Sequence, residues 1–183
     1  MPDLFTLRDL SAAIATAENR PDEERIFQQL KGASARGLLM HQDTHGPKGA
    51  LRFDLVDAAK ARVILRALDS GAAGKQLSDY VKVLCYETRK VLPNGQHVTL
   101  SLAEAFSTVN EVHWTIEVVQ TRSTDTGEPE QSVLWLPNGV RFGEVDPLDP
   151  TACIPGRVIE EVRHIQFSAL VRPIFAELLK AAN

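Results

Sequence analysis

The sequence predicts an α+β protein in two parts, residues 1–75 and residues 76–183. In the first part, apolar residues recur at helical spacing in two stretches, separated by the break Asn19-Arg20-Pro21. Apolar runs on either side of a glycine- and proline-containing turn follow, as in a short β-hairpin. In the second part, residues 112–122 and 131–136 alternate apolar and polar side chains, which is typical of paired strands.

Composition and charge indicate a folded protein without a membrane anchor. Of its 183 residues, 44% are hydrophobic and 24% are charged, and the net charge is −4. Residues 1–75 carry +1 (11 − 10), whereas residues 76–183 carry −5 (9 − 14). No apolar run approaches the roughly 18 residues of a membrane helix, and the start lacks the order of a secretory signal, so we expect a cytoplasmic protein. Cys85 and Cys153 are too few for a disulfide framework and predict reduced thiols.

The first two helices are predicted from their apolar stripes and their end signals. Leu7, Leu10 and Ile14 form the first stripe, and Thr6 with Asp9 fits a capping box at its start. Pro21 suits the first turn of a second helix, whose acidic start matches the helix dipole. The apolar stripe of this second helix consists of Ile26, Phe27, Leu30 and Ala33. The side chains that mostly lie off this stripe are Arg25, Gln28, Gln29, Lys31, Ser34 and Arg36. A polar helix face is most often a solvated surface, but these side chains are also those that reach base edges and phosphates.

A hairpin of the size of a wing is predicted directly after the helix-ending Gly37. We expect strands at 38–40 and 51–53, with Lys48 at the tip and Arg52 on the return strand. Such cations lie beside the minor groove or the backbone when a wing binds DNA. His41, Asp43 and His45 match no strong zinc spacing, so polar loop chemistry is the expected reading. A third helix then begins at Asp54 and ends at Ser70-Gly71.

This order of helix, turn, helix, hairpin and helix predicts a winged helix-turn-helix. The stretch also resembles the wing and following helix of MerR-type regulators, through Arg36-Gly37-Leu38-Leu39, Arg52-Phe53-Asp54 and Leu68-Asp69-Ser70-Gly71. The resemblance covers about 65 residues and implies a DNA-reading fold. Ile26-Phe27-Gln28-Gln29 stands where the family has an aromatic signature, the metal-binding cysteines have no counterpart, and the family's long antiparallel dimerisation helix is absent. The resemblance therefore implies DNA binding and does not imply metal sensing.

The second part is predicted to be a mixed helix and β-hairpin domain that ends in a long C-terminal helix. We expect a helix over 76–91 with Cys85 facing inward, and a short helix capped by Ser101. Trp114 and Trp135 on the two alternating runs are expected as core aromatics, with a base-stacking platform as the alternative. Arg157 is expected to open the last helix, which Pro173 kinks or splits. Its broad apolar surface suits packing on a second subunit.

The hypothesis is a sequence-specific DNA-binding protein, a bacterial or phage-type transcription regulator that works as a homodimer through residues 76–183. The expected DNA-contacting residues are Arg20, Arg25, Gln28, Gln29, Lys31, Arg36, His45, Lys48 and Arg52. We expect no enzyme, cofactor or metal, because phosphate-loop, serine-elbow and HExxH motifs are absent from the sequence. The alternatives are an excisionase-like or architectural DNA-binding accessory factor, a winged-helix protein-interaction module without DNA binding, and a small-molecule sensor.

Overall fold

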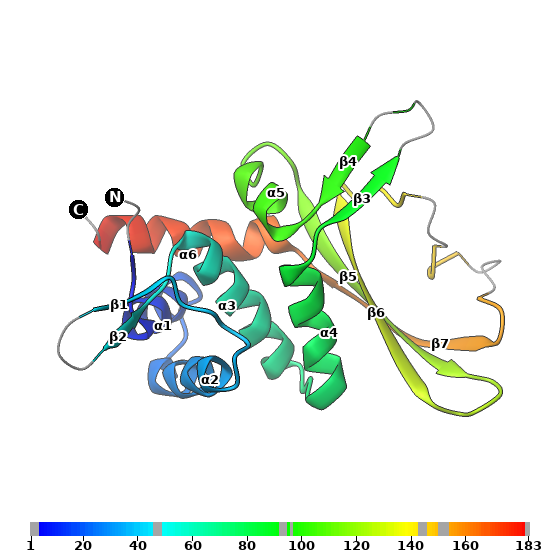
Figure 1. Ribbon diagram of the computed structural model, residues 1–183, viewed down its shortest axis with the longest axis horizontal. Coiled ribbons are helices and arrows are strands. Elements are labelled where there is room, and N and C mark those ends of the chain that lie inside the picture. The colour runs from blue at the N-terminus through cyan, green and yellow to red at the C-terminus, as the bar shows by residue number, and fades with distance from the viewer. Residues whose placement is uncertain are drawn as a thin grey trace. The chain divides into compact units, whose positions relative to one another are not determined.

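In a computed structural model, the structure describes residues 4–45, 49–91, 95, 97–142, 146–149 and 154–181 (Figure 1). The chain forms two compact units, one of residues 1–77 with 169–183 and the other of residues 78–168. The first boundary lies two residues beyond the expected one. The C-terminal segment belongs with the first unit, whereas the sequence analysis assigned it to the second.

The α+β class and the C-terminal helix are confirmed. The first unit contains α1 (Leu7–Ala17), α2 (Glu23–Ala35), β1 (Asp43–His45), β2 (Ala50–Arg52) and α3 (Leu55–Asp69), together with the start of α4 (Gly74–Cys85) and most of α6 (Phe167–Ala181). β1 and β2 pair antiparallel in register Asp43↔Arg52. Every helix among the described residues is too short or too polar to span a lipid bilayer.

Most of the expected helix end signals are present in the first unit, but Pro21 precedes Asp22, the N-cap of α2, and does not lie in the first turn of that helix. Thr6 and Asp9 form a reciprocal capping box at the start of α1, and Asp54 and Asp57 form another at the start of α3. Each box satisfies backbone N–H groups that have no partner inside the helix. Gly37 follows α2 with a φ of +71°, a conformation that costs glycine little.

A continuous apolar core joins α1, α2 and α3. Its fully buried side chains are Leu10, Ile14, Ile26, Leu30, Phe53, Ile64 and Leu65. Phe53 extends this core to the hairpin, because its backbone exchanges hydrogen bonds of 2.8 and 2.9 Å with the backbone of Phe5. The chain before α1 therefore lies beside the return strand of the hairpin.

The position of the first hairpin strand was predicted wrongly. Residues 38–40 form no strand, and β1 begins at Asp43. Leu39 is 2% exposed and closes the core after α2, while Met40 beside it is 67% exposed. A run of three apolar residues can form a strand, and it can equally follow the end of a helix with one leucine buried in the core. The sequence alone does not distinguish these two structures.

Asp57 gives stability a pH dependence. Burial raises the pKa of Asp57 above its ordinary value, and the hydrogen bond from Gln42 Nε2 opposes this shift. Because the folded-state pKa is the higher one, ionisation of Asp57 weakens the folded state, and this penalty disappears as the pH falls through that pKa. We expect the free energy of unfolding of Asp57→Asn, relative to that of the wild type, to rise with pH. Urea unfolding of both proteins between pH 4 and pH 7 measures this difference, and a difference that is constant with pH would contradict the expectation.

The described residues of the second unit form two antiparallel sheets. β3 (Thr88–Val91) pairs with β4 (His97–Leu100), and α5 (Leu102–Ser107) follows. The larger sheet has the order β6-β5-β7, with β5 (Trp114–Ser123) between β6 (Pro129–Pro137) and β7 (Arg157–Ile165). The predicted hairpin of residues 112–122 and 131–136 is thereby confirmed, in register Val118↔Val133.

Two helices were predicted too long. The helix expected over 76–91 ends at Cys85, which is exposed, and residues 88–91 form β3. The helix expected from Arg157 begins at Phe167, because residues 157–165 form β7 on the free side of β5. The apolar residues of this segment fit helical spacing and are also β-branched, which favours strands; they are Val158, Ile159, Val162 and Ile165. Pairing with β5 makes the segment a strand rather than a helix. Pro173 lies inside α6. Cys153 lies outside the described residues.

Trp114 and Trp135 are core residues, as expected. Each is 2% exposed, and their rings meet edge to face with centroids 5.8 Å apart. Trp114 Nε1 donates to Thr108 Oγ1 at 2.8 Å, and Trp135 Nε1 donates to the Val83 carbonyl at 3.1 Å. Rings buried and anchored in this way cannot stack on bases at the surface.

Candidate nucleic-acid interface

One face of α2 is apolar and buried, and the other carries polar side chains. Ile26, Leu30 and Ala33 are 0% exposed and pack in the core of the first unit. At about 100° per residue, positions 25, 28, 29, 32 and 36 form a second stripe that flanks the buried one and spans an arc of about 100°. We call this the outer face of α2. Lys31 lies to one side of it and is exposed.

The outer face lies in a stretch of positive charge. The sequence contains no Asp or Glu from Arg25 to Gln42, while Arg25, Lys31 and Arg36 contribute three cations. All three of these residues are exposed. Arg36 Nε donates to the Gly32 carbonyl at 3.0 Å. A local excess of cations, rather than the net charge of the chain, determines whether a surface attracts phosphates.

Gln28 and Gln29 of α2 differ in how freely their side chains could contact a ligand in front of the helix. Gln28 is exposed and its Nε2 donates to Glu24 Oε1 at 2.7 Å. Gln29 is half-buried, and its Oε1 is buried without a hydrogen-bond partner among the described residues. Gln28 is therefore the better placed of the two for contact with a ligand in front of the helix.

Gly32 lies in the middle of the outer face, where the fold does not require a glycine. A Cβ built on Gly32 would meet no atom within 4 Å, and its φ is not in the left-handed region. A glycine inside a helix costs roughly 0.5–1 kcal/mol relative to alanine. Its effect is to leave the helix backbone open to close approach from outside. The sequence analysis did not single out this residue.

Carboxylates are confined to the first turn of α2. Glu23 and Glu24 are exposed there. Arg8 of α1 binds Glu24 at 2.5 Å, and this hydrogen bond lowers the pKa of the Glu24 carboxyl. The Arg8 guanidinium also lies 3.6 Å from the centre of the Phe27 ring. Arg8 was missed by the sequence analysis because its partners lie on the next helix, outside any local spacing.

Among the expected contact residues whose side chains the structure describes, Arg20 forms ion pairs with carboxylates of its own fold. It binds Asp22 at 2.9 Å and Asp69 at 2.8 Å, and its side chain is 19% exposed. The hydrogen bond with Asp22 is the largest cause that raises the pKa of Arg20, and it lowers the pKa of Asp22. Glu18 joins this cluster and pairs with buried Arg62. We therefore assign Arg20 to the anchoring of the α1–α2 turn on α3, and leave it out of the candidate interface.

The hairpin contributes less than expected within the described residues. Lys48 lies outside them, and for His45 the structure describes only its backbone in β1. Arg52 is half-buried, and its Nη1 donates to the Leu4 carbonyl at 3.4 Å. The candidate interface of the described residues therefore consists of Arg25, Gln28, Gln29, Lys31, Gly32 and Arg36, with Arg8 beside it.

Comparisons with known proteins leave this surface unassigned. The chain matches no family model, no curated protein and no solved structure. The resemblance to MerR-type regulators stays a prediction. The described residues also contain no group of three or more His, Cys, Asp or Glu side chains that could hold a metal ion.

Proposed function

We propose that the first unit is a winged helix-turn-helix that binds double-stranded DNA, with the outer face of α2 in the major groove. The observation that carries this proposal is the combination of a cationic, carboxylate-free stretch with an open glycine at its centre. Arg25 and Gln28 would read base edges, because their side chains fit guanine and adenine acceptors and donors. Lys31 and Arg36 would contact phosphates.

The arrangement of the unit supports this proposal. α1 packs against α2 across a short turn, α2 also packs against α3, and the β1–β2 hairpin follows α2 (Figure 1). In helix-turn-helix proteins the second helix enters the groove while the first crosses the backbone, which is where Arg8 would lie. The specific form we propose is a dimeric transcription regulator that reads an inverted repeat.

The test is equilibrium binding to a fluorescent duplex of random sequence, followed by anisotropy as the salt concentration rises. With the two phosphate contacts of Lys31 and Arg36, log K falls against log salt with a slope of roughly −2. Lys31→Ala should weaken binding to all sequences alike and should flatten this slope by about one. Arg89→Ala, which removes an exposed cation from the second unit, is the matched control and should change neither quantity.

The main rival is a winged-helix module that binds a protein partner. Such a module would show no retention of DNA at low salt, and its affinity for duplexes would be insensitive to Lys31→Ala. An architectural accessory factor would instead bind without sequence preference and bend its duplex, which a circular-permutation gel assay measures.

A further inference from the structure

The free edge of β6 in the second unit has the properties of a site for an extended peptide. Within the part of the chain that the structure describes, β6 pairs with β5 on one side only, so alternate backbone N–H and C=O groups of β6 point away from the sheet. All residues of this region lie in the second unit, so the inference does not depend on DNA binding by the first.

Hydrogen bonds at the two ends of the hairpin show which residues of β6 face outward. Ser123 N donates to Glu128 O, and Asn138 N donates to His113 O. Even-numbered residues of β6 therefore bond to β5, and odd-numbered residues direct their backbone groups to the free edge. Pro129 and Pro137 occupy odd positions at the two ends of the strand, where a missing N–H does not weaken the ladder. Between them, the outward N–H and C=O groups of Val133 and Trp135 have no backbone partner among the described residues.

The two edges of the sheet differ in how well they are protected. β7 carries five charged or ionisable side chains in nine residues, and a register shift interrupts its pairing with β5 at Gln120/Thr121. Charges and bulges of this kind discourage pairing with another strand. Residues 131–136 of β6 carry no charge and no proline. The β6 edge is thus left open to an added strand.

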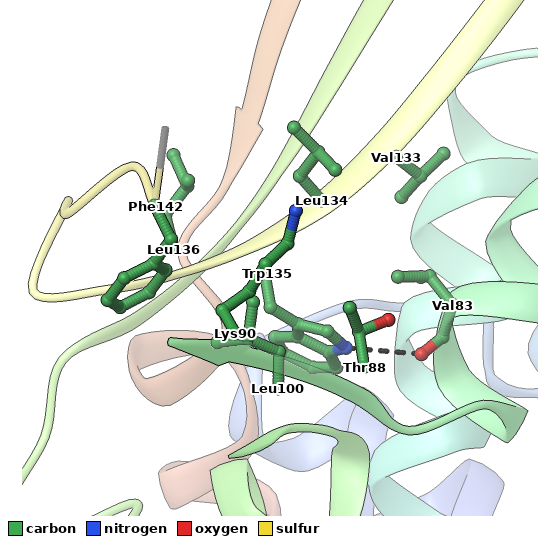
Figure 2. Close-up of a pocket in the computed structure, with 9 residues that line it drawn as sticks. All are labelled: Val83, Thr88, Lys90, Leu100, Val133, Leu134, Trp135, Leu136 and Phe142. Carbon is green, nitrogen blue, oxygen red and sulfur yellow. Dashed lines mark hydrogen bonds between the residues drawn. The ribbon is translucent and has the colours of Figure 1, made fainter. Parts of the chain in front are cut away.

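Two hollows lie along the open edge. Four consecutive residues, Val133 to Leu136, line the first, which has a volume of about 90 Å³. Consecutive residues of a strand point to opposite faces, so a hollow that touches all four lies along the strand edge. Figure 2 shows this hollow between β6 and three residues of other elements, which are Val83 of α4, Thr88 of β3 and Leu100 of β4. The Trp135 ring lies against the Val83 carbonyl, to which its Nε1 donates a hydrogen bond. The second hollow adjoins it at Val83, Thr88 and Val133 and is more polar, with Asp79, Lys82 and Ser132 in its lining.

The hollows lie where the side chains of an added strand would point. Residues of a peptide that pair with Val133 and Trp135 place their side chains on the same face of the sheet as those residues. That face is also where Trp135 Nε1 meets the Val83 carbonyl. Main-chain hydrogen bonds then give affinity, and the hollows select alternate side chains.

We propose that the second unit binds an extended peptide segment of another protein by strand addition to β6. The peptide carries an apolar side chain in the hollow lined by Val83, Leu100 and Trp135, and a polar side chain in the hollow beside Asp79 and Lys82. A second copy of β6 fits this site less well. The side chains it would bring to this face, Val133 and Trp135, already line the hollow of their own chain.

The test is a selection of randomised, phage-displayed seven-residue peptides on the wild-type chain, after depletion on Val133→Pro. The proline removes the outward N–H of Val133 and leaves the bonds between β6 and β5 in place. Val133→Thr keeps that N–H and is the matched control. Thr88→Arg is a second blocking variant, because Thr88 is exposed and lines both hollows. Near-ultraviolet circular dichroism of the buried tryptophans shows whether each variant is folded.

Selected peptides should share one apolar position and bind the wild type and Val133→Thr equally. Their affinity should fall at least tenfold for Val133→Pro and for Thr88→Arg. Their binding should slow hydrogen exchange of the Val133 and Trp135 amides. The proposal is overturned if no peptide is enriched, or if the peptides bind both blocking variants as well as the wild type. It is also overturned if the same amides become protected by self-association at high protein concentration without peptide.

Discussion

Gly32→Glu should lower the affinity for duplex DNA by about 100-fold, equivalent to roughly 2.8 kcal/mol. The substitution places a carboxylate at the centre of the outer face of α2, in a stretch that otherwise carries only cations. A like charge opposed to phosphate costs several kcal/mol, and the longer side chain also keeps the helix backbone away from the groove. Anisotropy titration at constant salt measures the change.

Two matched variants separate binding from folding at this position. Gly32→Ala should raise the free energy of unfolding by about 0.5–1 kcal/mol, because a Cβ there has no neighbouring side chain within 4 Å among the described residues, and it should weaken DNA binding less than glutamate does. Ala103→Glu adds the same charge at an exposed position of α5 and should leave binding unchanged. Equal losses for Gly32→Glu and Ala103→Glu would show that only net charge matters.

Phe53→Ala should destabilise the first unit by about 3–5 kcal/mol, the largest loss of stability we expect from one substitution. Phe53 is 0% exposed, directly precedes the Asp54 cap of α3, and holds the Phe5 backbone beside the hairpin. The substitution leaves a cavity where the Phe53 ring packs between the helices and the hairpin. Chemical unfolding followed by circular dichroism at 222 nm measures the loss.

Phe53→Leu is the control for this effect. It keeps most of the buried volume and should cost less than about 1.5 kcal/mol. DNA binding by Phe53→Leu should stay close to that of the wild type. If Phe53→Ala cost no more than the leucine variant, the hairpin would not be anchored to the helical core as described.

The parts of the fold that follow from local sequence were predicted well. The capping box at Thr6, the helix start at Asp54 and the helix end at Gly37 depend on residues within four positions of each other, and all three are present. β7 was mistaken for a helix because its β-branched residues fit both periods, and its partner β5 lies more than 30 residues away. A pattern within one segment carries no information about that pairing.

The candidate interface shows the same limit. The outer face of α2 follows from helical spacing, so Arg25, Gln28 and Arg36 could be placed in advance. The capture of Arg20 by Asp69 depends on a contact 49 residues apart, and the approach of Arg8 to Glu24 joins two helices. The open surroundings of Gly32 became visible when the neighbouring atoms were known.

The most direct measurement of the central proposal is the enrichment of duplex fragments from a randomised library by the wild-type protein, with Gly32→Glu selected in parallel. If the outer face of α2 reads DNA, the wild type should enrich one motif with two-fold symmetry, Arg25→Ala should change the preferred base at one position of each half-site, and Gly32→Glu should enrich nothing. Recovery of the same motif by Gly32→Glu, or no enrichment by the wild type at low salt, would contradict the proposal.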